Sequence, residues 1–342
     1  MHMARKLLGL ALAAFIATLA WADEIALNPR HPDRYVVVPG DTLWDISKRF
    51  LRDPWLWPEV WQVNPQIENP HLIYPGDVIT LVYVNGKPQL KVQRGPATVK
   101  LSPKARPERI DKAIPTIPLD AIRQFLTRPL VVGKKDMEKA AYVLSSPERR
   151  IVLGAGDRIY ARGLASDGPG RYSLFRPGDE FVDPETGESL GWEAIYAGEA
   201  RMERFGDPAT LHLVETTREI TPGYRLLPVG EEEVHINFLP HGPKDEIHGQ
   251  ILSVLGGVSQ IGQYQVVVIN RGTRENMEVG HVLRVRQAGE TMRDPFSKNE
   301  KVRLPDEDAG LMMVFRTFEK VSYGLIMEAT RPIHVGDIVT NP

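Results

Sequence analysis

Hydrophobic and polar positions change their period several times along this chain of 342 residues. The stretch "YVVV" at residues 35–38 is rich in β-branched residues, which is typical of a strand. Leu43, Ile46 and Phe50 then recur at the spacing of one helical face. Pro58 can start a second helix, and Val78–Tyr83 has the pattern of a second strand. The order strand, helix, helix, strand predicts an antiparallel pair of strands with both helices on one side.

Both predicted strands lie beside the same tripeptide, Pro-Gly-Asp, at residues 39–41 and 75–77. A glycine can take the backbone angles of a sharp corner that other residues resist. Thr42 is followed three residues later by Asp45, which forms a capping-box pattern, so we expect a helix to open at Thr42.

The chain from residue 119 onward has a different pattern. Asp120–Leu126 is a possible short helix, and short β-like runs separated by Gly and Pro follow it. Many short strands at this spacing predict small barrels or sandwiches. We expect a middle β domain at 119–232 and a last β domain at 243–342, joined through residues 231–246.

A small residue, Gly and often Asp precede several of these runs. They do so at Gly156-Asp157, Gly178-Asp179, Gly280-His281 and Gly336-Asp337. Since each Asp or His holds the same place before a strand, we interpret the pattern as turn chemistry rather than as a catalytic set.

The first residues have the pattern of an export signal. Arg5 and Lys6 precede the uncharged apolar run Leu7–Leu19, and Ala20-Trp21-Ala22 offers an A-x-A cleavage site. The run is short for a membrane span, which needs about 20 residues, so residues 1–22 are predicted to be a cleaved signal peptide. No other stretch is long and apolar enough for a span, so we expect an exported protein without one.

Composition excludes several classes of chemistry. The chain has no cysteine, which rules out disulfides, thiolate metal sites and Cys nucleophiles. Removal of residues 1–22 takes two basic residues away, leaving 40 basic against 44 acidic residues, a net charge of −4. That balance argues against nucleic acid as the main partner.

Residues 85–118 are predicted to be a linker. Prolines punctuate the segment, and residues 86–112 carry eight basic against two acidic residues. A solvated, semi-extended tether is the favoured interpretation. Contact with an anionic surface such as cell wall or lipid headgroups is the alternative.

Residues 34–84 resemble a LysM domain, the small βααβ module that binds polymers containing N-acetylglucosamine. The resemblance is carried by "YVVVPGDTLWDISKRF" at the front and "NPQIENPHLIYPGDVI" at the back, while "LRDPWLWPEVW" between the helices is longer than is usual. It implies a shallow glycan-binding groove between two loops that sit side by side. The first wall would be Gly40, Asp41, Thr42 and Leu43, and the second Asn69, Pro70, His71, Leu72, Ile73 and Pro75. Backbone groups would bind the acetamido sugars, and Leu43 and Ile73 would contact the acetyl methyl group.

Four tryptophans lie in this stretch. A domain this small must bury large side chains to be stable, so Trp57 and Trp61 are predicted to be core. Trp44 lies off the Leu43–Ile46–Phe50 face and is the best candidate for an exposed, sugar-stacking ring.

No catalytic residue, metal ligand or cofactor is predicted, and we expect no enzyme activity. The closest metal-like spacing is His241, Asp245 and His248, which lies in the predicted joint and offers no H-E-x-x-H or H-x-H pair. Serine-nucleophile motifs of the G-x-S-x-G type are absent. A glycosidase needs only two suitably spaced carboxylates and stays open as an alternative.

The whole layout resembles the LysM proteins associated with the type IV pilus secretin of Gram-negative bacteria, whose last domain is similar to that of a flagellar outer-ring protein. The resemblance implies a periplasmic scaffold that holds peptidoglycan at one end and an outer-membrane secretin ring at the other. Exposed β edges are candidate docking sites. A peptidoglycan-remodelling enzyme, or a LysM adaptor for another envelope machine, are the alternatives.

Overall fold

The computed structural model describes residues 25–61, 73–93, 113–126, 131–229, 238–255, 260–297 and 299–342. The chain divides into two compact units, Met1–Ile114 and Pro115–Pro342. The predicted signal peptide lies outside the described residues. Among the described helices, none combines the length and the apolar character needed to cross a bilayer.

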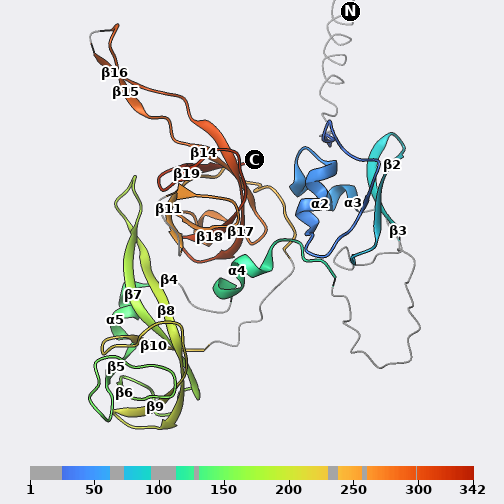
Figure 1. Cartoon of the computed structure of the whole chain (residues 1–342). Helices are drawn as coiled ribbons and strands as arrows, with labels where there is room; N and C mark the ends of the chain where they lie inside the picture. The colour runs from blue at the N-terminus through green and yellow to red at the C-terminus, as the bar shows by residue number, and fades with distance from the viewer. Residues whose placement is uncertain are drawn as a thin grey trace, which may run out of the picture. The chain divides into compact units, whose positions relative to one another are not determined.

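The first unit has the predicted order of elements (Figure 1). Strand β1 (Arg34–Val36) is followed by helices α2 (Leu43–Phe50), η2 (Pro54–Leu56) and α3 (Trp57–Trp61), and then by strand β2 (Val78–Val84). Strands β1 and β2 pair antiparallel, with Tyr35 opposite Ile79. The predicted strand, helix, helix, strand order is therefore confirmed.

A third strand, β3 (Lys87–Gln93), extends this sheet. It pairs with β2 along its whole length, and its Leu90 and Val92 side chains are buried in the core of the unit. Ile114 packs in the same core, and its N–H donates to the Ile73 carbonyl over 2.8 Å. The prediction of a linker from residue 85 is therefore wrong for Lys87–Gln93, because these residues complete the sheet.

The second unit begins with helix α4 (Leu119–Leu126), strand β4 (Val131–Val132) and helix α5 (Lys134–Lys139). Six strands then form the first barrel: β5 (Ala141–Ser145), β6 (Arg158–Arg162), β7 (Arg171–Val182), β8 (Ser189–Arg204), β9 (Ala209–Thr216) and β10 (Arg225–Pro228). Their sheet closes because β8 pairs with both β7 and β9. Strand β4 adds to the outer part of β8.

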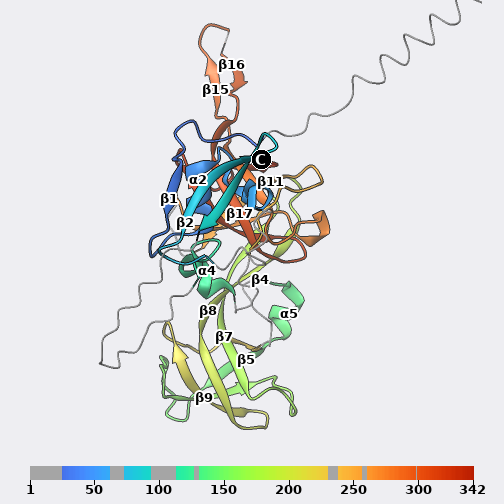
Figure 2. The same ribbon diagram turned by 90° about the vertical axis from the view of Figure 1, so that its right-hand side faces the viewer.

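A second closed barrel follows (Figures 1 and 2). Its strands are β11 (His248–Leu255), β13 (Val266–Ile269), β14 (Val282–Gln287), β17 (Glu307–Thr317), β18 (Ser322–Ala329) and β20 (Ile338–Thr340). Shorter elements are β12 (Gln260–Ile261), η3 (Thr273–Glu275) and β19 (Ile333–His334). Strands β15 (Thr291–Asp294) and β16 (Glu300–Arg303) form a hairpin that projects from the connection between β14 and β17.

The two barrels share one topology. When the strands of each barrel are numbered in chain order, neighbours around both barrels follow the order 1-2-5-4-3-6, and strand 6 pairs with strand 1. The correspondence extends to short ladders: Leu153 pairs with Ile220 in the first barrel, and Ile261 pairs with Ile333 in the second. The expectation of small barrels is confirmed, and the shared topology identifies them as a structural duplication.

One kind of turn recurs in all three folded parts. In four cases the N–H of the first residue donates to the carboxylate of an Asp three positions later, over 2.8–3.1 Å. The third residue is a glycine with φ between +92° and +96°, an angle that favours glycine. These turns are Val38–Asp41, Tyr74–Asp77, Gly154–Asp157 and His334–Asp337.

The interpretation of the recurring Gly-Asp pattern as turn chemistry holds at Asp157 and Asp337. It is wrong at Gly178 and Asp179, which lie inside strand β7. Gly178 faces the β8 side chain of Glu193, and an added Cβ would come within 2.7 Å of its carboxylate oxygen. Close approach of two strands, rather than a turn, explains that glycine.

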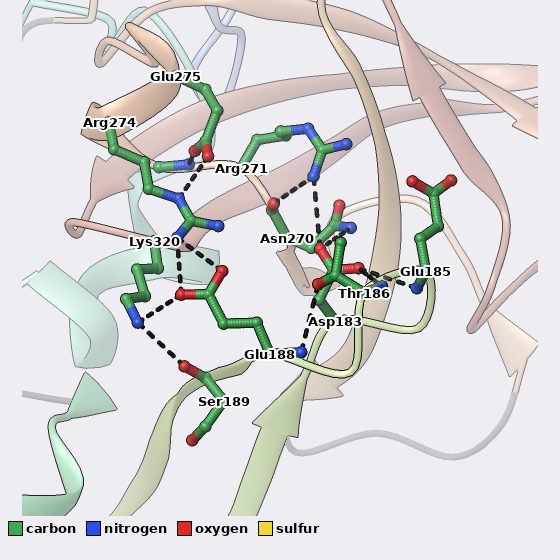
Figure 3. A network of polar contacts seen from close by, with 11 residues as sticks. Asp183, Glu185, Thr186, Glu188, Ser189, Asn270, Arg271, Arg274, Glu275 and Lys320 are labelled. Carbon is green, nitrogen blue, oxygen red and sulfur yellow. Dashed lines mark hydrogen bonds and ion pairs between the residues drawn. The ribbon is translucent and has the colours of Figure 1, made fainter.

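The tip of the β7–β8 hairpin joins the first barrel to the second (Figure 3). Asp183, which is buried, accepts a 3.0 Å hydrogen bond from the amide of Asn270, which is also buried. Glu188 accepts from Arg274 over 2.9 Å and from Lys320 over 2.7 Å. An acidic tip thus docks on a basic and amide-bearing end of the second barrel.

The turn of the hairpin tip and the joint together favour the ionised form of Asp183. Burial alone would raise its pKa, but hydrogen bonds from the amides of Thr186 and Glu185 and from the Asn270 side chain together outweigh it, and the pKa lies below its ordinary value. Hydrogen bonds from Lys320 and Arg274 lower the pKa of Glu188 as well. Because both pKa values are depressed in the folded state, the joint is favoured above the ordinary carboxyl pKa and weakens as the pH falls through the lowered values.

We predict that Asp183→Ala loosens this joint at neutral pH and that acid does the same in the wild-type chain. Amide hydrogen exchange measured over residues 183–189 and 270–275 should rise in both cases. Glu185→Gln in the same exposed turn is the matched control, since no side-chain contact of Glu185 crosses to the second barrel in the described structure. Equal protection in Asp183→Ala and Glu185→Gln would contradict the assignment.

Candidate functional site

The two Pro-Gly-Asp turns lie against each other at one end of the β1–β2 ladder. The N–H of Val37 donates to the Asp77 carbonyl over 2.9 Å, and the N–H of Gly76 donates to the Val37 carbonyl over 2.8 Å. The sequence expectation that these two loops sit side by side is confirmed for their described residues.

Asp41 holds the first turn together. Its side chain is buried and accepts hydrogen bonds from the Val38 N–H over 2.9 Å and from the Tyr35 hydroxyl over 2.9 Å. Burial, and then the hydrogen bond to Asp41, raise the pKa of Tyr35. Asp41 is therefore committed to the turn, and its carboxylate is not displayed as a free acceptor for a sugar.

Thr42 caps helix α2 as predicted. Its hydroxyl accepts from the Asp45 N–H over 3.1 Å and donates to the Asp45 carboxylate over 2.7 Å. The first N–H groups of a helix have no partner within the helix. Thr42, Leu43 and Trp44 are only 4%, 0% and 1% exposed, so the first amides of α2 are covered in this structure and are not presented at the surface.

The remaining predicted glycan contacts divide into three groups. Gly40 is exposed with φ of +96°, and Pro75 is half-buried. The side chains of Leu43 and Ile73 are 0% exposed and pack in the core, so the expectation that they meet an acetyl methyl group is wrong for this structure. Asn69, Pro70, His71 and Leu72 lie outside the described residues.

The four tryptophans of residues 34–84 are all buried. Trp57 and Trp61 pack edge to face with ring centroids 6.1 Å apart, as the core prediction required. Trp44 is only 1% exposed, which overturns its prediction as an exposed stacking ring. Helix α2 is buried on more than one face. Trp44 and Ser47, which lie beside the apolar stripe, are buried as well as the stripe residues Leu43, Ile46 and Phe50.

An open hollow adjoins the first turn. It is lined by side chains of the segment before β1, of β1 itself and of α2, including Tyr35, Asp41 and Arg49. The Arg49 guanidinium lies 4.5 Å from the centre of the Tyr35 ring, which fixes both side chains at its floor. Sequence analysis missed Tyr35 and Arg49, because their contact depends on how the strand packs against the helix.

His241, Asp245 and His248, whose spacing in the sequence resembles that of metal ligands, do not form one cluster of ligand atoms among the described residues. Asp245 accepts from Asn276, and His248 opens strand β11. Within the described residues, one other group, His241, Glu278 and His281, brings its ligand atoms within 4.8 Å of one another. His281 Nδ1 accepts the Glu278 N–H over 3.1 Å, the same place that the Asp carboxylate takes in the other turns. The turn therefore accounts for His281 without a metal.

Comparison with known proteins gives one match. Residues 35–82 match the family model of the LysM domain. No curated protein matches the chain. The LysM match supports binding of peptidoglycan and other N-acetylglucosamine glycans, and the matched residues contain both turns described above.

We predict that Asp41→Ala opens the first turn. It leaves the Val38 N–H and the Tyr35 hydroxyl without their acceptor, a cost of about 1–3 kcal/mol in the free energy of unfolding. Binding of N-acetylglucosamine oligomers should weaken in the same variant, because the first of the two adjoining loops loses the hydrogen bonds that fix its shape. Thermal unfolding and calorimetric titration of residues 25–114 measure the two effects.

Asp53→Ala is the control for that variant. Asp53 caps η2 without a side-chain hydrogen bond, so its loss should change neither measurement appreciably. A stable Asp41→Ala domain with wild-type sugar affinity would show that the turn does not organise the site.

Proposed function

We propose that this protein is a non-catalytic periplasmic scaffold, which holds peptidoglycan through its LysM domain and an outer-membrane secretin, that of a type IV pilus, through its two barrels. The single observation that carries the wall-binding half is the LysM match over residues 35–82 with both of its turns formed. The secretin half and the periplasmic location rest on the resemblance of the domain layout and on the predicted signal peptide.

The two closed barrels are rigid bodies on which a partner such as the secretin can dock. Each set of six strands is closed, so among the described residues the two-residue strand β4, which pairs with β8, is the one edge strand on either barrel. The expectation of docking at exposed β edges therefore does not apply to the barrel walls themselves.

Weak individual contacts suffice for such a scaffold. Among the described residues, the first LysM turn adjoins an open hollow rather than a deep pocket. When several copies attach to one assembly and one wall, the effective concentration of each site for its ligand rises steeply. A modest affinity at each end then gives a durable attachment.

Sedimentation with purified sacculi tests this function. We predict that the whole chain and residues 25–114 sediment with sacculi and that residues 115–342 stay in solution. The first fragment ends at residue 114 because β3 and Ile114 complete its core.

The supernatant distinguishes the alternatives. Release of soluble muropeptides by the whole chain would contradict the scaffold and favour a wall-remodelling enzyme. Sacculus binding without any association with a secretin would favour an adaptor for another envelope machine. Failure of residues 25–114 to sediment would contradict wall binding through the LysM domain.

A further inference from the structure

The two barrels carry the same tip on the same hairpin. The hairpin between the third and fourth strands ends in Asp183-Pro-Glu-Thr-Gly-Glu188 in the first barrel and in Asp294-Pro-Phe-Ser-Lys-Asn-Glu300 in the second. Asp183 accepts from the N–H two residues later over 2.9 Å, and Asp294 does so over 2.8 Å. Near the end of each turn stands a residue with positive φ, Gly187 at +72° and Asn299 at +59°.

The first tip is docked and the second is not. Asp183 and Glu188 bind the second barrel, as described above. In the second tip the Phe296 side chain is 96% exposed, and all of β16 is exposed. An isolated two-stranded hairpin is marginally stable in water.

The second hairpin also carries charges that oppose its own pairing. Arg293 lies directly opposite Lys301, and Asp294 lies directly opposite Glu300. Like charges at facing positions of a hairpin destabilise it. A partner that supplies opposite charges and an apolar contact would offset the like-charge repulsion and cover the exposed Phe296 side chain.

The directions of the strands determine which end of a barrel receives such a tip. All neighbouring strands are antiparallel, so the third-to-fourth hairpin lies at one end of each barrel. The end of the second strand and the four-residue loop between the fourth and fifth strands lie at the other end. In the second barrel these two places hold Asn270 and Lys320, which receive the docked tip.

The corresponding end of the first barrel is uncovered. Arg162 ends its second strand and Asp207 lies in its fourth-to-fifth loop, with side chains 50% and 57% exposed. The two side chains pair with each other, since the Arg162 guanidinium donates to both Asp207 carboxylate oxygens, over 3.0 and 2.9 Å. Phe205 opens the same loop and is 45% exposed, at the position that Phe318 holds in the second barrel. Docking would exchange the exposed Arg162–Asp207 pair for contacts of Arg162 with the Asp294–Glu300 pair and of Asp207 with the Arg293–Lys301 pair. Phe205 would cover the Phe296 ring.

We propose that the Asp294–Glu300 tip of one molecule docks on the Arg162, Phe205 and Asp207 end of the first barrel of a second molecule. The contact uses the same end of a barrel as the joint that links the two barrels within one molecule, but with different side chains, since Asp207 holds the loop position of Lys320. Donor and acceptor surfaces differ, so the interface is heterologous, and repetition builds a ring or an open chain of molecules according to whether the rotation closes. This inference is independent of the proposed ligands of the scaffold.

Sedimentation velocity of the purified chain over a rising concentration series tests the proposal. The wild-type chain should form dimers and larger species. The donor variant Phe296→Ser and the acceptor variant Arg162→Ala with Phe205→Ser should each remain monomeric. An equimolar mixture of the two should form dimers and nothing larger, because each pair retains one intact donor and one intact acceptor.

The matched control is Ile151→Ser, which removes a 76% exposed apolar side chain from the first barrel away from either surface. It should associate like the wild type. A wild-type chain that is monomeric throughout would overturn the proposal. So would equal loss of association in Ile151→Ser, association that survives in the acceptor variant, or a mixture that stays monomeric. Circular dichroism of each variant ensures that a loss of association is not a loss of fold.

Discussion

The structure depends on one small turn, which occurs twice in the LysM domain and once in each barrel with an Asp as acceptor. A glycine in the left-handed region reverses the chain, and a side chain at the next position accepts the N–H of the residue three places earlier. Either feature alone would leave strain or an unpaired N–H, and together they make a rigid corner next to a strand. In the LysM domain two such corners lie against each other and set the direction of helix α2. In the first barrel such a corner precedes β6 and pairs with Leu213 of β9, and in the second barrel one precedes β20 and pairs with Ile251 of β11.

Repetition is also present at the level of whole domains. One barrel topology occurs twice, and one acidic hairpin tip occurs with it. Within the molecule the first tip meets a basic barrel end and becomes a buried, charged joint. The second tip keeps the shape and the acidic residues of the first without a described partner in the molecule. A scaffold that must span distance gains from this arrangement, because each added barrel can use the same joint.

The sequence predicted the LysM part well because its signals are local. The capping pattern at Thr42, the 43–46–50 stripe and the paired glycines each act within a few residues. Strand β3 was missed because its proline and its two lysines resemble a linker, and only pairing with β2 makes it a strand. Trp44 was misplaced because a helical stripe says which face is apolar, not how far the neighbouring turns wrap around a short helix.

The site was predicted in part. The turn residues were identified, but the burial of Leu43 and Ile73 and the Tyr35–Asp41 contact follow from packing between distant segments. The barrels were expected, while their closure and shared topology depend on strand pairings that no local pattern specifies. One sequence signal was available and was overlooked: the motif Asp-Pro, one residue, then Thr or Ser, with a Glu closing the turn, at residues 183–188 and 294–300.

The central claim is that one chain links the wall to a second assembly through two separate units. The most direct test is to sediment sacculi with a purified secretin complex, adding either the intact chain or an equimolar mixture of residues 25–114 and 115–342. The account predicts that the secretin sediments with the intact chain and stays in solution with the mixture. Sedimentation of the secretin with both, or with neither, would contradict it.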